Sequence, residues 1–275
     1  MYVQLLRIHQ LAIWEWPGSG TPILFTHATG FHARLWDQII KQLPDRHCYA
    51  IDSRGHGQSD KNFDSYEWRR FGEDAAMVAK ELGLRGAIGV GHSLGGHAMA
   101  LAAALEPDAF SRLLLADPVI MPPDRYDGSD NHVEFIARRR ARWKSPAEMY
   151  ERFCGRLPFS TWKPEILRDY CEYGLLLEGD EDEYVLACPP EIEAAIYQRS
   201  NWPSADISTE VSQIKIATTI LRSAKFMTRE HFDLSASATD PHLASRMPNA
   251  EDVYLENCSH FIPMEHPELI ISALK

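Results

Sequence analysis

A serine between small residues is the first place in this sequence where chemistry is expected. Residues 91–96, GHSLGG, follow the apolar run 87–90 and precede the helix-prone segment 97–105. A serine at a sharp strand-to-helix turn has a strained backbone and an exposed hydroxyl, and flanking glycines let the neighbouring backbone pass close by. The amide of Leu94 would begin the helix, where the helix dipole favours negative charge. The pattern therefore predicts Ser93 as a nucleophile and the Leu94 amide as one donor of an oxyanion hole.

The elements that must position this turn alternate along the first 118 residues. Helical patterns lie between short apolar runs typical of buried strands, at residues 22–26, 47–51, 87–90 and 113–116. Strands that alternate with helices indicate parallel pairing, with helices on both faces of the sheet. We therefore predict an α/β fold with a mostly parallel central sheet flanked by helices.

The character of the chain changes after residue 118. Residues 119–212 hold few β-branched runs and many aromatic and charged side chains, with helical candidates at about 133–144, 146–156, 164–177 and 190–199. Strand character returns at 214–221 and 252–255, and a helix is predicted between them over 228–238. We predict one α/β core formed by residues 1–118 and 213–275, with residues 119–212 inserted as a helical cap.

Composition excludes several classes of partner. The 275 residues carry a net charge of −11, which argues against nucleic acid or an anionic membrane as the main partner. The five cysteines are an odd number without C-x-x-C spacing, so neither a disulfide framework nor a zinc site is expected.

The first residues lack a signal-peptide pattern and no apolar run is long enough to span a membrane. The expected location is the cytoplasm, and a homo-oligomer is compatible with the sequence.

Together with the serine turn, two further motifs resemble those of the α/β-hydrolase fold family, specifically its small capped, carboxylesterase-like serine hydrolases. Residues 52–59, DSRGHGQS, look like the D-x-R-G-H-G-x-S segment after the fourth strand of that family. Residues 259–267, SHFIPMEHP, look like its catalytic-histidine loop. The order and spacing of the three motifs extend the resemblance over nearly the whole chain.

The resemblance implies a catalytic triad. It makes His260 the general base that takes the proton of Ser93 and later returns it to the leaving group, with His266 as a competing candidate. Family members usually carry the triad acid after the strand that corresponds to residues 214–221, yet residues 222–227, RSAKFM, contain no carboxylate.

Some family members carry the acid one strand earlier, and Asp117 occupies that place here. Because both strand ends open on the same edge of the sheet, a carboxylate at Asp117 can reach the Nδ1 side of His260. The expected acid is therefore Asp117. Glu230 and Asp233 are the fallbacks, and a Ser–His dyad without an acid is the remaining alternative.

The second oxyanion donor is expected in the loop after the strand at 22–26. Family members often show His-Gly there, whereas this chain reads HATG over residues 27–30. By position, the amide of Thr29 would join that of Leu94, with Gly30 as the near alternative. The His27 side chain is expected to be structural.

Several other polar residues are expected to be structural as well. Asp52, Arg54 and His56 are interpreted as holding their own loop together by hydrogen bonds and an ion pair. The basic run 138–142 is interpreted as a solvated helix face rather than an anion site.

The expected reaction is hydrolysis of a small-molecule carboxylic ester through an acyl-enzyme on Ser93, with no metal and no organic cofactor. A serine at this position argues against the dehalogenases and epoxide hydrolases of the family, which use aspartate. A lactonase, an amidase, a carbon–carbon bond hydrolase and a cofactor-free haloperoxidase-like enzyme would use the same triad. A ligand receptor without enzymatic activity on the same fold is the alternative from a different class.

Overall fold

An eight-stranded sheet forms the centre of the molecule. The computed structural model describes residues 2–129, 131, 133–179, 183–224 and 233–275. The strands lie in the order β1-β2-β4-β3-β5-β6-β10-β11. Pairing is antiparallel at β1–β2 and β2–β4 and parallel across the other five neighbours, so the predicted mostly parallel sheet is confirmed. The strand bounds are Gln4–Ile8 (β1), Leu11–Trp16 (β2), Gly20–Thr26 (β3), Arg46–Asp52 (β4), Ala87–His92 (β5), Phe110–Ala116 (β6), Ala217–Ser223 (β10) and Ala250–Leu255 (β11).

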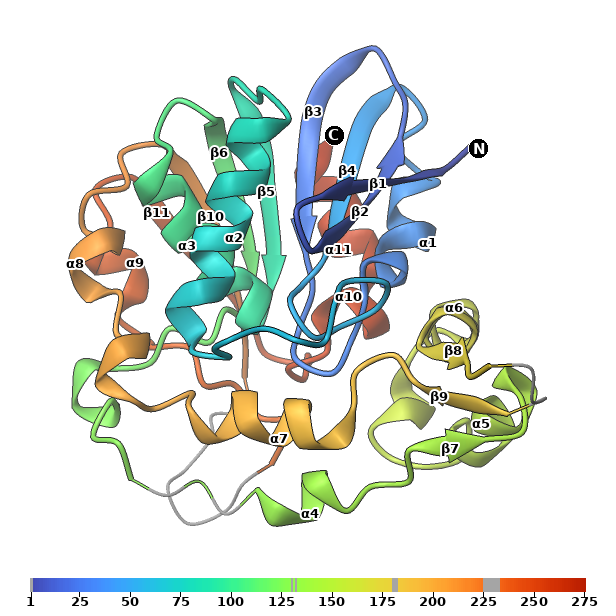
Figure 1. Cartoon of the computed structure of the whole chain (residues 1–275). Helices are drawn as coiled ribbons and strands as arrows, with labels where there is room; N and C mark the ends of the chain where they lie inside the picture. Colours follow the sequence, from blue (N-terminus) through green and yellow to red (C-terminus); the bar gives the residue numbers. More distant parts are fainter. Residues whose placement is uncertain (1, 130, 132, 180–182, 225–232) are drawn as a thin grey trace.

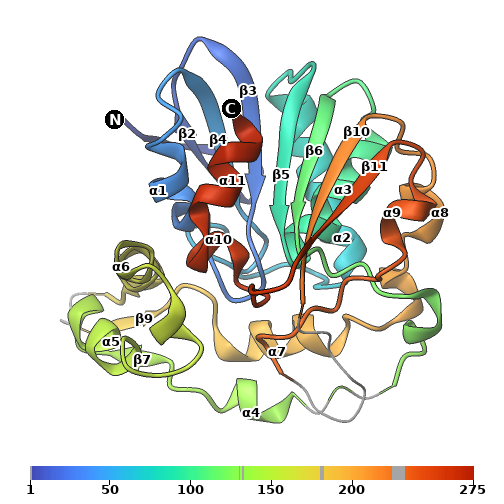
Figure 2. The ribbon, with the colours of Figure 1, turned by 180° about the vertical axis from the view of Figure 1, so that it is seen from behind.

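Helices cover both faces of this sheet (Figures 1 and 2). The helices α2 (Trp68–Glu81) and α3 (Leu94–Leu105) lie on one face, together with α8 (Ser208–Val211) and α9 (Leu243–Arg246). The opposite face carries the short α1 (Asp37–Ile40), which follows the 3-10 turn η1 (Ala33–Trp36), and α10 (Ile262–Glu265) and α11 (Pro267–Leu274).

The strand sequences explain why both faces are covered. Side chains alternate between the faces of a strand, so a continuous apolar run supplies apolar groups to both. In β3, Leu24 packs into the core beneath α2 and α3, whereas Ile23 and Phe25 pack into the core beneath α1 and α11. All three side chains are fully buried.

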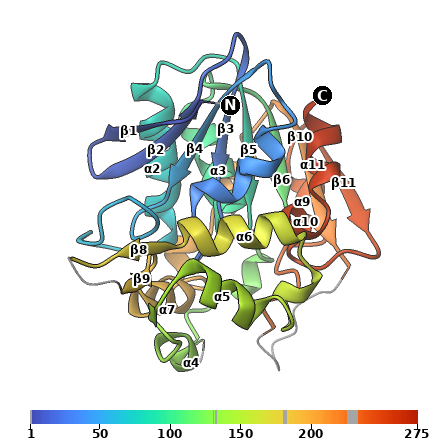
Figure 3. The same cartoon turned by 90° about the vertical axis from the view of Figure 1, so that its right-hand side faces the viewer.

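Apart from α8, which packs against α3, the chain between β6 and β10 forms a separate layer at the carboxyl ends of the parallel strands (Figures 1 and 3). This insertion contains α4 (Glu134–Ala137), α5 (Pro146–Phe153), α6 (Pro164–Tyr173) and α7 (Pro190–Gln198), and the 3-10 turns η2 (Pro123–Arg125), η3 (Phe159–Thr161) and η4 (Pro203–Ala205). It also holds a small antiparallel sheet made of β7 (Arg142–Trp143), β9 (Tyr184–Leu186) and β8 (Leu175–Leu177). The layer lies where the predicted cap was expected, while the proposed division into two domains stays a prediction.

Three helix predictions differ from the structure. The pattern over 164–177 yields helix only in α6, because Leu175–Leu177 pair with β9 as the strand β8. The pattern over 133–144 yields helix only in α4, because the chain then becomes extended and Arg142–Trp143 pair with β9. The predicted helix over 228–238 is wrong for residues 233–238. There the Asp233 carboxylate accepts hydrogen bonds from the backbone and the hydroxyl of Ser235, a local turn that competes with a helix. The rest of that segment lies outside the described residues.

Among the described residues, no helix combines the length and the apolar character needed to cross a membrane.

Candidate functional site

Ser93 occupies a strained turn between β5 and α3. Its backbone has φ +58° and ψ −122°, a combination that side-chain-bearing residues rarely adopt. A Cβ on Gly91 would lie 2.4 Å from the carbonyl oxygen of Gly95, and a Cβ on Gly95 would lie 2.4 Å from that of Thr26. Both glycines are therefore required by close backbone approach, as the sequence pattern predicted. The strain keeps the Ser93 side chain at the carboxyl end of the sheet, beneath the insertion.

Three predicted residues come together in one hydrogen-bonded chain. The Nε2 atom of His260 lies 2.9 Å from the Ser93 hydroxyl oxygen, and its Nδ1 lies 2.6 Å from an oxygen of Asp117. His260 is in the loop between β11 and α10, and Asp117 directly follows β6. If Nδ1 carries its proton toward the carboxylate, Nε2 is left as the acceptor for the serine proton. The arrangement can therefore activate the Ser93 hydroxyl as a nucleophile.

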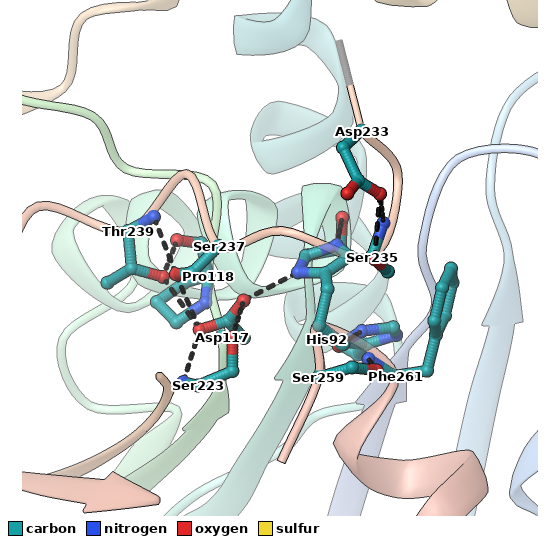
Figure 4. Close-up of polar contacts among 12 residues, drawn as sticks. His92, Asp117, Pro118, Ser223, Asp233, Ser235, Ser237, Thr239, Ser259 and Phe261 are labelled. Atoms are coloured by element: carbon teal, nitrogen blue, oxygen red, sulfur yellow. Dashed lines mark hydrogen bonds and ion pairs between the residues drawn. The ribbon is translucent and has the colours of Figure 1, made fainter. Parts of the chain in front are cut away.

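The Asp117 carboxylate is fully buried and fixed by several donors (Figure 4). One oxygen accepts from the Ser223 amide at 2.8 Å, the Ser237 hydroxyl at 2.8 Å and the Thr239 hydroxyl at 3.4 Å. The other oxygen faces His260 and also lies 3.3 Å from the Ser223 hydroxyl. Ser223 ends β10, the strand next to β6, so neighbouring strand ends supply the acid and one of its donors.

Asp233, one of the two fallback acids, does not take this position. The Asp233 carboxylate accepts hydrogen bonds from the amide and the hydroxyl of Ser235, at 2.9 and 2.7 Å. The Ser235 carbonyl in the same loop accepts a hydrogen bond from the His260 amide. Glu230 lies outside the described residues. The competing base, His266, is on the surface 3.2 Å from Glu268.

One of the two predicted oxyanion donors, Thr29, lines the same cavity as Ser93. It follows β3 in the chain. Leu94 is the first residue of α3, where a backbone amide has no partner within its own helix. The Gly30 amide is engaged, because it donates to Nε2 of His56 at 2.9 Å. The geometry thus favours Thr29 over Gly30 as the available donor. In addition, the Thr29 hydroxyl is buried and has no hydrogen-bond partner among the described residues.

The 52–59 loop supports the Thr29 loop. Asp52 accepts from the amides of Ala33 and Gln58, and Arg54 pairs with Asp74 at 2.7 Å. Burial lowers the pKa of His56 well below its ordinary value, which keeps the ring neutral and Nε2 free to accept. These contacts agree with the structural roles expected for the loop.

His92 is a supporting residue that the sequence analysis did not identify. It is fully buried, and its Nε2 donates to the backbone carbonyl of His260 at 2.8 Å. Burial, with a smaller contribution from the neighbouring His260, lowers the pKa of His92 to about 3, so the ring is neutral. Its place in the serine turn gave no signal, because only the three-dimensional fold brings the His260 loop beside it.

A cavity of about 380 Å³ opens over Ser93 and His260. Its walls are mainly aromatic, with Phe31, Trp143, Phe153, Phe159, Trp162, Tyr170, Tyr197 and Phe261. The insertion supplies six of these eight side chains. The charged wall residues are Arg139, Arg140, Arg152, Arg156 and Glu193.

The interpretation of 138–142 as a solvated face is wrong for part of the run. Arg139 and Arg140 line the cavity, because the expected helix ends at Ala137 and the chain turns toward β7. Arg139 donates to Glu193 at 2.5 Å and to the Tyr170 hydroxyl at 3.3 Å. Burial raises the pKa of Glu193, and Arg139 opposes that shift. Arg138 is exposed and is not among the cavity-lining residues.

Within the described residues, no group of three or more His, Cys, Asp or Glu side chains is arranged to hold a metal ion.

Known proteins resemble the chain in sequence over different lengths. A non-heme chloroperoxidase of Kitasatospora aureofaciens is 25% identical over 266 residues, 91% of this chain and 88% of that protein. A 2-(acetamidomethylene)succinate hydrolase of Mesorhizobium japonicum is 37% identical over 101 residues, which is 36% of each protein.

Solved structures resemble the whole fold. A crystal structure of E-2-(acetamidomethylene)succinate hydrolase superposes with a TM-score of 0.75 at 22% identity, covering 99% of this chain and 97% of that one. An esterase from Mycobacterium tuberculosis gives a TM-score of 0.73 at 23% identity, covering 99% and 89%. At these identities the likeness supports the fold alone. The alpha/beta hydrolase family model matches residues 23–273, which include every element of the site, and the chain belongs to that family.

Proposed function

We propose that this protein hydrolyses carboxylic esters through an acyl-enzyme on Ser93. The observation that carries the proposal is the chain of contacts from Asp117 through His260 to the Ser93 hydroxyl, 2.6 and 2.9 Å long, at the base of an aromatic cavity. We assign Ser93 as nucleophile, His260 as general base and Asp117 as the acid that orients the base.

The reaction has two halves. The Ser93 oxygen attacks the ester carbonyl while His260 Nε2 takes the serine proton, and the carbonyl oxygen becomes an oxyanion held by the amides of Thr29 and Leu94. The intermediate collapses, the carbon–oxygen bond to the alcohol breaks, and His260 returns the proton to the departing alcohol. Water then loses a proton to His260, attacks the acyl-enzyme and releases the carboxylic acid and the free serine.

The experiment combines turnover with covalent labelling. Purified protein is assayed on a panel of p-nitrophenyl esters of different chain length, and a fluorophosphonate is used to label the nucleophile, with mass spectrometry to locate the adduct. We expect turnover and an adduct on Ser93, with both lost in Ser93→Ala and retained in Ser245→Ala, a surface serine. A wild-type protein that neither hydrolyses the panel nor is labelled would refute the assignment.

A second candidate function rests on similarity. The relative that matches over 91% of this chain is named a chloroperoxidase. In a cofactor-free reaction of that kind, hydrogen peroxide replaces water in attacking the acyl-enzyme, and the released peracid oxidises halide. Bromination of monochlorodimedone in the presence of acetate and peroxide tests this activity, and Ser93→Ala should abolish it.

A further inference from the structure

The cavity carries positive charge although the protein is acidic. The whole chain has a net charge of −11, yet the cavity walls hold four arginines and one glutamate. Glu193 compensates Arg139, and Arg140 is paired with Glu148 at 2.8 Å. Arg152 and Arg156 then remain, and neither has an ion pair or a side-chain hydrogen bond to the described residues.

These two arginines come from one stretch of the insertion. Arg152 lies in the last turn of α5. Arg156 lies four residues later, in a turn where its own amide donates to the Phe153 carbonyl. Both are exposed and also line the cavity, so they occupy the solvent-facing part of its wall. Two like charges on one exposed wall repel each other modestly, and an anion that binds between them would relieve that repulsion.

A planar guanidinium binds a carboxylate through two parallel hydrogen bonds, which is its strongest common interaction with an organic anion. We propose that the natural substrate is an ester that carries a second, free carboxylate, and that Arg152 and Arg156 bind this carboxylate while Ser93 attacks the ester carbonyl. This inference rests on the proposed ester hydrolysis. The aromatic walls, which include Trp143 and Phe159, would hold the apolar chain between the two ends.

The two arginines therefore act as specificity residues, because they do not touch the reacting atoms. Local positive charge is also what such a substrate needs in order to bind, since the net charge of the protein repels anions at long range. Uncharged esters of the same shape gain nothing from the two guanidinium groups.

The test uses two substrates that differ only in charge. Ethyl hydrogen adipate and ethyl hexanoate have the same ester group and differ at the far end, where a carboxylate replaces a methyl group. We compare wild type, the double variant Arg152→Gln/Arg156→Gln and the matched control Arg138→Gln, which changes an exposed charge of the insertion away from the cavity. Thermal unfolding verifies that all three are folded.

We expect wild type to prefer the adipate monoester by at least about tenfold in kcat/KM, the effect of one charge-assisted hydrogen bond. The double variant should lose that preference through a raised KM and keep its activity on ethyl hexanoate, and Arg138→Gln should behave as wild type. Added salt should raise the KM for the charged ester alone. Equal kcat/KM values for the two esters in wild type, or an unchanged ratio in the double variant, would overturn the inference.

A binding measurement separates this inference from the proposed function. Ethyl hydrogen adipate is titrated into Ser93→Ala protein by calorimetry, with and without the two arginine substitutions. Binding that depends on the arginines supports carboxylate recognition even if no ester is turned over, in which case only the hydrolase assignment fails. Binding that is absent, or the same without the arginines, refutes carboxylate recognition and leaves ester hydrolysis untouched.

Discussion

Replacing Asp117 by asparagine changes one atom and removes one charge. In the native site, three donors converge on the oxygen of Asp117 that faces away from His260: the Ser223 amide and the hydroxyls of Ser237 and Thr239. An asparagine must present its carbonyl oxygen to those donors, since its NH₂ group cannot accept. The NH₂ group therefore faces Nδ1 of His260.

In this orientation, His260 can no longer act as the base for Ser93. An NH₂ group opposite Nδ1 can only donate, so the stable tautomer of His260 carries its proton on Nε2 and cannot accept the proton of Ser93. The same tautomer error in a serine protease triad lowers kcat by about 10⁴, and we expect a loss of similar order here. At about 1.4 kcal/mol for each factor of ten, that corresponds to about 5 kcal/mol of transition-state stabilisation.

The assay is steady-state hydrolysis of p-nitrophenyl butyrate at pH 8. Asp117→Asn keeps an acceptor for all three donors, so its thermal unfolding temperature should stay close to that of wild type. The matched control is Asp233→Asn, which removes a carboxylate from the neighbouring loop and should leave kcat within about threefold, because that group does not contact His260. Near-full activity in Asp117→Asn, or a larger loss in Asp233→Asn, would show that the acid is misassigned.

Three further predictions follow from buried groups. Burial lowers the pKa values of His32 and His97 to about 4 in the folded protein, against 6.5 in the unfolded chain. Each neutral histidine therefore contributes to the free energy of unfolding above pH 6.5, and this contribution is lost as the pH falls from 6.5 toward 4. Each histidine should lower the free energy of unfolding by about 2 kcal/mol between pH 7 and pH 5. The free energy of unfolding of His97→Gln, measured with denaturant, should therefore depend less steeply on pH than that of wild type. An equally steep dependence on pH would contradict this. Thr29→Val removes the buried Thr29 hydroxyl, which has no partner among the described residues, and should lower kcat by about tenfold if that hydroxyl donates to the oxyanion. Thr29→Ser should retain activity, and equal rates in the two variants would exclude the role. His92→Leu removes the donor to the His260 carbonyl and should lower kcat by about tenfold, the effect of one lost hydrogen bond, with little change in KM; a change confined to KM would be inconsistent with positioning of the base.

The sequence predicted the serine turn and its partners because local rules and motif order determine them. Strand, glycine spacing and helix around Ser93 follow from backbone sterics, and neighbouring parallel strands necessarily bring the residue after β6 toward the end of β10. Asp117 could therefore be found without knowing which donors surround it. Those donors, Ser223 and Ser237, are ordinary serines in sequence, and only the fold brings them to one carboxylate.

The structure of the insertion was harder to predict, because local patterns do not determine it. Its elements are short, so helical periodicity could not distinguish α4 from the extended chain that follows it, and Arg139 was assigned to solvent as a result. Pairing of β7 with β9 joins segments more than forty residues apart, with Arg142 opposite Val185, and no local pattern encodes that contact. The cavity walls depend on this pairing, so the sequence could not identify the residues that select a substrate.

The loop that carries Thr29 is held from two sides. The Gly30 amide donates to His56 of the core, and on the other side a Cβ at Gly30 would lie 2.5 Å from the carboxylate of Glu193 in α7. Gly30 also has φ +77°, which favours glycine. Glu193, which pairs with Arg139 inside the insertion, therefore packs directly against the loop that carries Thr29. Packing of the insertion therefore affects both the loop that carries Thr29 and the cavity walls, so a change in that packing should alter kcat and specificity together.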